Sequence, residues 1–131
     1  EIVLCMLSDL ASLRNAKSLY DYLVAQRPND SAPRLVVNMT EAPKRPEIPM
    51  KELIDAVGAP PSCVLTYDSL LFGTAANNGQ MVSEVDPKNK NALALLDLAS
   101  QLARRGVSMA ANTKDKSPLA PLLALLKGRK A

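Results

Sequence analysis

Residues 2–7 read IVLCML, six apolar side chains in succession without a polar residue between them. A short apolar run that lacks alternation is typical of a strand buried on both faces of a parallel sheet. Two similar runs follow, RLVVNM at 34–39 and CVLT at 63–66. Helical patterns separate the three runs, so the sequence predicts an α/β fold in which three parallel strands alternate with helices.

The segments between these runs carry the start and stop signals of helices. Over 10–26, apolar residues recur every three or four positions, and Ser8 or Asp9 would cap the start of this helix. A shorter amphipathic pattern occupies 50–57, and Gly58 is a suitable residue to end it. Both helices are therefore predicted as crossovers between parallel strands.

The rest of the chain divides into three parts. The connection 67–87 shows no clean period, which predicts a functional loop with one helical turn near 70–76. A strong amphipathic helix is predicted over 89–105. We expect residues 1–106 to form one structural unit, 107–117 a flexible linker and 118–131 a short amphipathic tail.

Composition is typical of a globular protein, with 47% hydrophobic residues, 22% charged residues and a net charge of +3. We expect no signal peptide, and no apolar run reaches the roughly 20 residues that a membrane-spanning helix needs, so we predict a cytoplasmic protein. The chain begins at Glu1 and enters an apolar strand at once. We interpret this abrupt start as a sign that the chain is a piece of a longer one.

The sequence contains no catalytic constellation. It has no histidine, which excludes Ser-His and Cys-His pairs, and it has neither a G-x-x-x-x-G-K-[ST] nor a G-x-G-x-x-G motif. The acidic residues are scattered, and the two cysteines, Cys5 and Cys63, are expected to be buried thiols rather than metal ligands. We therefore predict neither catalytic residues nor a metal site in this chain.

Polar residues follow the predicted strands at their carboxyl ends, where open α/β sheets bind ligands. Asn38 ends the second strand, and Thr66, Tyr67 and Asp68 end the third. An Asn amide has a donor and an acceptor that match the edge of adenine. Two structural alternatives remain open: a turn or cap role for Asn38 and an anchoring cap for Asp68.

Four stretches together resemble one family in the same order: LASLRNAK at 10–17, VVN at 36–38 followed by PKRPEI at 43–48, YDSLLFGTAANNGQM at 67–81, and a Leu-rich tail ending KGRK at 127–130. They resemble the C-terminal part of the ATPase domain in the CpaE/TadZ family of pilus-assembly proteins. This family belongs to the MinD/ParA branch of deviant-Walker P-loop ATPases. The implied fold class is the C-terminal half of a parallel-sheet P-loop NTPase domain.

The resemblance implies that Asn38 hydrogen-bonds adenine and that the backbone of Thr66, Tyr67 and Asp68 lines the base pocket. Members of the family usually have Pro where Thr66 stands. The cofactor would be ATP, with Mg in the full-length parent, and the phosphate loop would lie upstream of this chain. The fragment should therefore be inactive alone.

The implied parent is an ATP-dependent switch of dimerisation and localisation in Tad/Flp (type IV) pilus assembly. Its partners would be a second copy of itself and other Tad/Flp pilus components. The alternative is a non-catalytic localisation or scaffold module of the MinD/ParA lineage for positioning a pilus or a cell pole. The tail 118–131 would either bind a membrane surface, placing the protein at the inner membrane or cell pole, or pack on protein. Nucleic acid is not expected as a partner, because the basic residues are few and lack interleaved aromatics.

Overall fold

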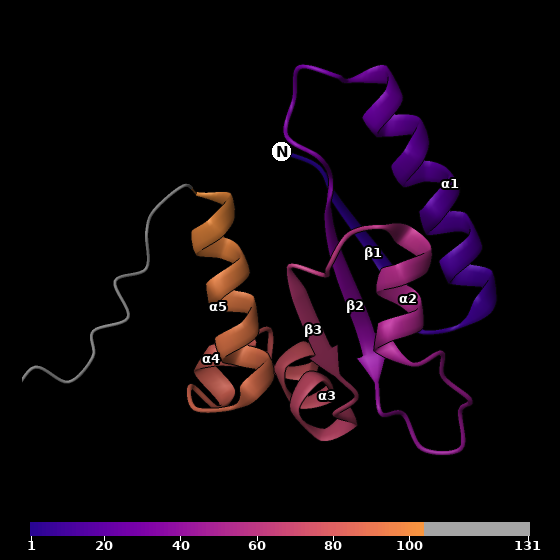
Figure 1. Ribbon diagram of the computed structural model, residues 1–131. Helices are drawn as coiled ribbons and strands as arrows, with labels where there is room; N and C mark the ends of the chain where they lie inside the picture. The colour runs from indigo at the N-terminus through magenta and orange to yellow at the C-terminus, as the bar shows by residue number, and fades with distance from the viewer. Residues whose placement is uncertain (104–131) are drawn as a thin grey trace, which may run out of the picture.

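The computed structural model describes residues 1–103, which contain a parallel sheet of three strands in the order β1-β2-β3 (Figure 1). In chain order the elements are β1 (Val3–Leu7), α1 (Leu10–Gln26), β2 (Arg34–Thr40), α2 (Met50–Val57), β3 (Cys63–Thr66), α3 (Ser69–Asn78), α4 (Val82–Val85) and α5 (Lys90–Leu102). The α/β fold class is confirmed. Beyond residue 103 lie the end of the predicted helix 89–105, the linker 107–117 and the tail 118–131, all outside the described residues.

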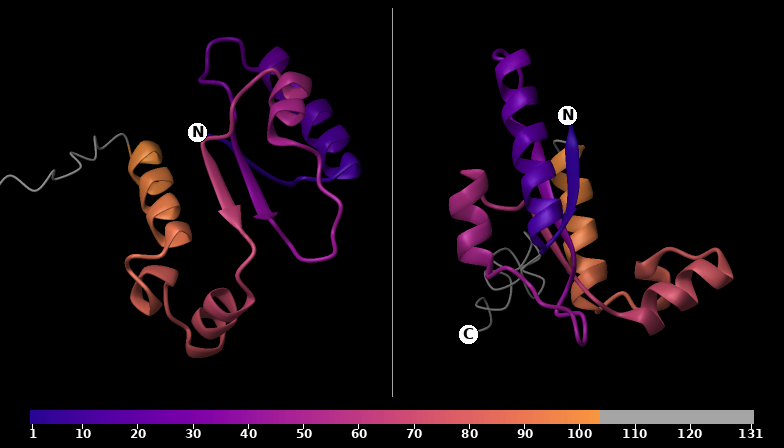
Figure 2. Two further views of the ribbon diagram at one scale, coloured as in Figure 1. Left: turned by 60° about the horizontal axis from the view of Figure 1, so that its bottom comes forward. Right: turned by 90° about the vertical axis from the view of Figure 1, so that its right-hand side faces the viewer.

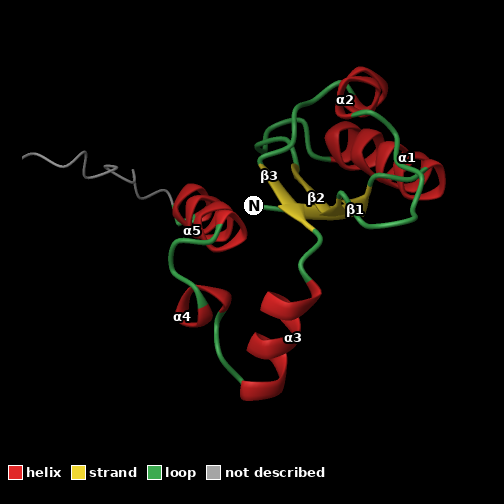
Figure 3. Cartoon of the chain, turned by 90° about the horizontal axis from the view of Figure 1, so that it is seen from below, coloured by secondary structure: helices red, strands yellow, loops and turns green. Residues whose placement is uncertain are grey.

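Helices pack on both faces of the sheet. Figure 3 shows α1 and α2 on one side and α5 on the other, beside β3. Leu35 and Val37 of β2 pack towards α1 and α2, whereas Val36 packs towards Leu98 of α5. Because β2 is buried on both faces, it has the continuous apolar sequence that parallel strands require.

The strand β1 differs from this prediction. Its apolar run has the same character as that of β2, yet Val3 is 39% exposed and Cys5 is exposed. The reason is that α5 covers β3 and β2 without reaching β1. The expectation of a buried thiol is therefore wrong for Cys5 and confirmed for Cys63, which is 5% exposed.

The connection after β3 is largely helical, in contrast to the predicted loop with one helical turn. Asp68 caps α3 by accepting a hydrogen bond from the backbone N–H of Leu71 (2.9 Å). Gly79 ends this helix with a φ of +64°, a left-handed conformation that glycine adopts without strain. The helices α3 and α4 project away from the sheet (Figure 2). Within residues 1–103, no helix is long and apolar enough to cross a membrane.

The loop between β2 and α2 is fastened to the start of α1. Asp9 caps α1 by accepting from the N–H of Ser12 (2.8 Å), and it also pairs with Arg45 Nη2 (3.0 Å). Glu47 accepts from the N–H of Ala42 (3.4 Å). We refer to Asp9, Arg45 and Glu47 as the acidic clasp.

Both carboxyl groups of the acidic clasp are stabilised in the ionised form. Hydrogen bonds from backbone N–H groups are the largest cause in each case, and they hold the pKa of Asp9 and the pKa of Glu47 below their ordinary values. Partial burial opposes this effect, and the Arg45 guanidinium adds to it. The loop is therefore held most firmly when both acids are charged.

The helix α5 is tied to the sheet at both of its ends. Near its C-terminal end, Gln101 Oε1 accepts from Arg34 Nη1 (3.0 Å) at the amino end of β2. The same Arg34 also pairs with Glu1 (3.1 Å). Near the start of α5, Asn91 contacts the carboxyl end of β3. These two ties fix the helix along the length of the sheet.

Candidate functional site

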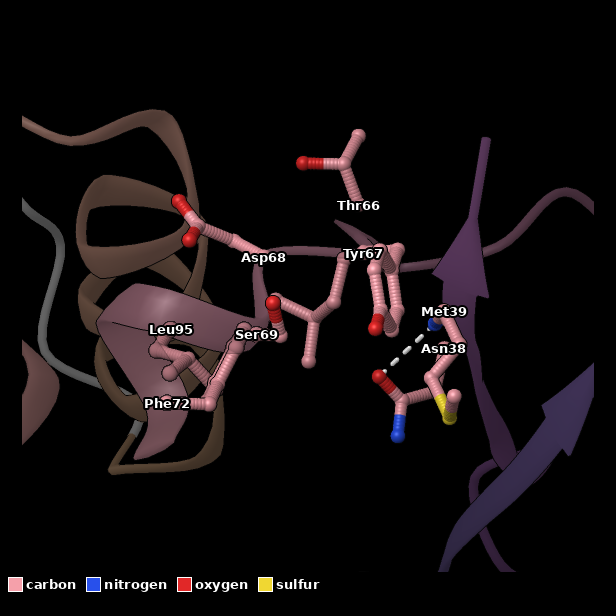
Figure 4. A pocket seen from close by; sticks show the side chains of 9 residues that line it. Asn38, Met39, Thr66, Tyr67, Asp68, Ser69, Phe72 and Leu95 are labelled. Carbon is pink, nitrogen blue, oxygen red and sulfur yellow. Dashed lines mark hydrogen bonds between the residues drawn. The ribbon is translucent and has the colours of Figure 1, made fainter. Parts of the chain in front are cut away.

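A cavity of about 360 Å³ lies at the carboxyl ends of β2 and β3, next to α3 and α5 (Figure 4). Its lining consists of Asn38, Met39, Leu65, Thr66, Tyr67, Asp68, Ser69, Phe72 and Leu95. All four predicted site residues are thus brought together by the fold. The cavity occupies the edge of the sheet at which α/β proteins bind ligands, and its volume is within the range of small-molecule pockets.

Asn38 lies half-buried at the end of β2. Its side-chain oxygen accepts a hydrogen bond from the backbone N–H of Met39 (2.8 Å), as Figure 4 shows. Its amide nitrogen takes part in no hydrogen bond with any described residue. Asn38 therefore serves as a turn residue through its oxygen and still has an unused donor at the cavity.

The backbone is strained directly after Asn38. Met39 has a φ of +55°, and the register between β2 and β3 shifts between Val37 and Thr40. A non-glycine residue in this left-handed region costs roughly 1–2 kcal/mol, and such strain is concentrated at functional sites. Thr40 secures the bulge, because its carbonyl accepts from the N–H of Tyr67 (2.7 Å).

A side chain of α5 holds the end of β3. Thr66 donates to Asn91 Oδ1 through its N–H (2.9 Å) and its hydroxyl (3.2 Å), and its carbonyl accepts from Asn91 Nδ2 (3.1 Å). Asn91 is 1% exposed. Both backbone groups of Thr66 are therefore engaged with α5, and its N–H has no further hydrogen to donate to a ligand.

The side chain of Asp68 also has a structural task. It caps α3, and Figure 4 shows its carboxylate turned away from Asn38. The anchoring alternative is therefore the one that the geometry supports for this carboxylate. What Asp68 leaves unpaired is its backbone N–H, which makes no hydrogen bond to the described residues.

Several polar groups of the lining residues make no hydrogen bond within residues 1–103, among them Asn38 Nδ2, the carbonyl of Tyr67 and the N–H of Asp68. Tyr67 is 40% exposed, and its ring lies beside Asn38 (Figure 4). The remaining walls are mainly apolar, from Leu65, Phe72, Leu95 and Met39. Two donors, one acceptor and an aromatic face suit a flat heterocycle.

The charges around the cavity argue against a phosphate or metal site in the same place. Asp68 is the one ionisable carboxyl in the lining, and neither Lys nor Arg contributes to it. Among the described residues, no group of three or more His, Cys, Asp or Glu side chains is placed to hold a metal ion. The site therefore fits the uncharged ring of a ligand.

Asn91 was not anticipated from the sequence. The sequence gives little sign of its role, because Asn91 is simply a polar residue near the start of an amphipathic helix. The structure shows that Asn91 and Ala92 are both buried there. A polar residue on the inward face of a helix needs a buried partner. Its partner, Thr66, is 25 residues away in the sequence, so no local pattern identifies it.

The fold resembles solved structures of MinD and ParA proteins. A ParA family ATPase from Chlorobium tepidum TLS matches with a TM-score of 0.63 and 24% identity, over 76% of this chain and 40% of that chain. The MinD cell division protein of Aquifex aeolicus matches with a TM-score of 0.61 and 16% identity, over 78% and 43% of the two chains. The septum site-determining protein MinD from Pyrococcus horikoshii OT3, complexed with Mg-ADP, matches with a TM-score of 0.61 and 19% identity, over 76% of this chain and 40% of that chain.

No protein-family model and no curated protein matches the sequence. The chain spans about two-fifths of the length of the solved structures that it matches. Identities below 25% show the fold alone. On this basis, the described residues have the fold of part of a MinD/ParA-type P-loop ATPase domain, with three parallel strands alternating with helices.

Proposed function

We propose that this chain is the base-binding part of a MinD/ParA-type ATPase and that its cavity receives the adenine ring of ATP. The observation that carries this proposal is that residues lining the cavity have unpaired polar groups, among them Asn38 Nδ2, the Tyr67 carbonyl and the Asp68 N–H. The MinD from Pyrococcus horikoshii OT3, which has a similar fold, was solved with Mg-ADP.

The chemistry of adenine matches this set. Its exocyclic amine is a donor that suits the Tyr67 carbonyl, and its ring nitrogens are acceptors that suit the two donors. The ring of Tyr67 offers a face for stacking, which stabilises bases by about 1–3 kcal/mol in nucleic-acid complexes. Mg and the phosphates would be held outside this chain, because the sequence has no phosphate-loop motif.

The proposed parent is a CpaE-like ATPase that acts in Tad/Flp pilus assembly as an ATP-dependent switch of dimerisation and localisation. The sequence resemblance over 36–48 and 67–81 is what supports the pilus role. Its partners would be a second copy of itself, forming a homodimer, and other pilus components. It would act in the cytoplasm, at the periphery of the inner membrane or at the cell pole. The MinD of Aquifex aeolicus, with a similar fold, was solved in a complex with MinC.

The test compares ATP with tripolyphosphate in the full-length parent. Asn38→Ala removes a contact to the base, so ATP binding should weaken about fivefold to tenfold, the equivalent of one hydrogen bond. Tripolyphosphate, which has no base, should bind as before. Asn77→Ala is the matched control, because Asn77 is exposed on α3 and does not line the cavity.

Calorimetric titration of the parent and both variants gives these affinities. An equal loss for ATP and tripolyphosphate in Asn38→Ala would contradict the assignment of the base. An equal loss of ATP binding in Asn77→Ala would show that the effect is not specific to the cavity. ATP turnover by the same parent then separates a hydrolysing switch from a non-catalytic scaffold.

A further inference from the structure

The side chain of Asn91 takes the place of a neighbouring strand. Among the described residues β3 is an outer strand, paired with β2 alone. Asn91 accepts from the N–H of Thr66 and donates to its carbonyl, at 2.9 and 3.1 Å. An adjacent strand would satisfy the same two groups in a ladder. The difference is that this partner is a side chain of α5, so the position of the helix determines the position of the peptide.

The next residue is held from the opposite side. The N–H of Tyr67 donates to the carbonyl of Thr40 (2.7 Å) in β2. The chain is thus fixed at Thr66 by α5 and at Tyr67 by β2. Between these anchors and the cap of α3 at Asp68 stands the carbonyl of Tyr67, which has no partner within residues 1–103. The two anchors fix the peptide between Thr66 and Tyr67, which directly precedes this carbonyl.

The same helix also forms a wall of the cavity. Leu95 lines it and lies four residues after Asn91, on the same face of α5. Asn91 itself is not part of the lining. Any influence of Asn91 on a ligand must therefore act through Thr66 and the carbonyl that follows it.

We propose that Asn91 is a positioning residue that sets the base selectivity of the cavity, by fixing Thr66 so that the Tyr67 carbonyl accepts from an exocyclic amine. This inference rests on the proposed function. The ligand class that it favours is a purine with a 6-amino group. A purine without that amine would leave the carbonyl unpaired, which is penalised when the group is desolvated.

The test measures selectivity rather than affinity alone. Adenosine and purine riboside, which lacks the 6-amino group, are titrated into the full chain and followed by two-dimensional NMR. In the unaltered chain adenosine should bind about fivefold to tenfold more tightly, as one hydrogen bond predicts. In Asn91→Ala this ratio should fall to about one. Asn91→Ser, which retains a hydroxyl, should give an intermediate ratio and serves if the alanine variant does not fold.

Val57→Ala is the control for a general loss of stability. Val57 is 2% exposed in the core on the opposite face of the sheet, under α1 and α2. This variant should keep the ratio of the unaltered chain, because Thr66 and Tyr67 keep their anchors. A purely structural role for Asn91 would instead leave the ratio equal in all folded variants.

The outcomes separate the two proposals. If the unaltered chain binds neither nucleoside, the proposed base-binding function fails, and this inference fails with it. If the unaltered chain binds adenosine and an Asn91 variant keeps the same ratio, the inference alone is overturned. A ratio of one in the unaltered chain, or a ratio lost equally in Val57→Ala, also overturns the inference and leaves base binding intact.

Discussion

Replacing Asn91 with Asp tests the contact between α5 and β3 through its dependence on pH. The two side chains have nearly the same shape, so the change is confined to the donor that faces the Thr66 carbonyl at 3.1 Å. A protonated Asp retains a donor, whereas an ionised Asp has none. An ionised carboxylate at this position would also be almost completely buried, because Asn91 is 1% exposed.

The size of the effect follows from these contacts. Leaving the Thr66 carbonyl without a donor costs about 1–3 kcal/mol. Burial of the charge adds several kcal/mol, which the two donors of Thr66 at 2.9 and 3.2 Å partly offset. We expect the ionised form to be about 3 kcal/mol less favourable than the protonated form, so burial raises the pKa of the introduced carboxyl well above its ordinary value.

The sign of the pH dependence follows from this raised pKa. The stability of the variant relative to the unaltered chain is retained below the ordinary pKa of Asp, about 3.9, and is lost as the pH rises through the raised pKa. Urea unfolding of both chains, followed by circular dichroism between pH 4 and 8, gives this difference. Asn91→Ala should show a loss that does not change with pH. A pH-independent loss in the Asp variant would refute the assigned contact.

Three further predictions concern other parts of the chain. Because both acids of the acidic clasp have lowered pKa values, their contribution is present above about pH 4 and is lost as the pH falls through those values, so thermal unfolding of the unaltered chain should shift to lower temperature in acid. With iodoacetamide at pH 8, exposed Cys5 should react well before Cys63, whose pKa is raised chiefly by burial; equal rates by mass spectrometry would contradict the fold. Lys44 has a φ of +59°, so Lys44→Gly should stabilise by about 0.5–1 kcal/mol in urea, whereas Lys51→Gly within α2 should destabilise by about the same amount.

The strand β2 and the helix α1 could be predicted because their signals are local. A strand buried on both faces has a continuous apolar run, and Asp9 is followed by helical spacing. By contrast, α3 buries only Leu71 and Ala75, so its sequence has no visible period. The exposed face of β1 was missed because its apolar run does not show which neighbours cover it.

The position of the candidate site could also be predicted, but the polar groups that are free to bind a ligand there could not. Carboxyl ends of parallel strands meet at one edge, which brings Asn38 to the residues 66–68. Which groups are free depends on contacts distant in sequence. The side chain of Asn91 hydrogen-bonds the backbone N–H and carbonyl of Thr66, and the carboxylate of Asp68 accepts from the N–H of Leu71. Only the structure identifies the carbonyl of Tyr67 as unpaired.

Because α5 is attached to the sheet through both Asn91 and Gln101, it is a suitable place for a fluorescent reporter of its docking. The helix runs about 15 Å from Asn91, near the cavity, to Gln101, which contacts Arg34 at the amino end of β2. A fluorophore on exposed Ala103, introduced as Ala103→Cys in a chain with Cys5→Ser, would therefore stand clear of the cavity. It would follow the docking of α5 optically, without competing for the space that a bound base would fill.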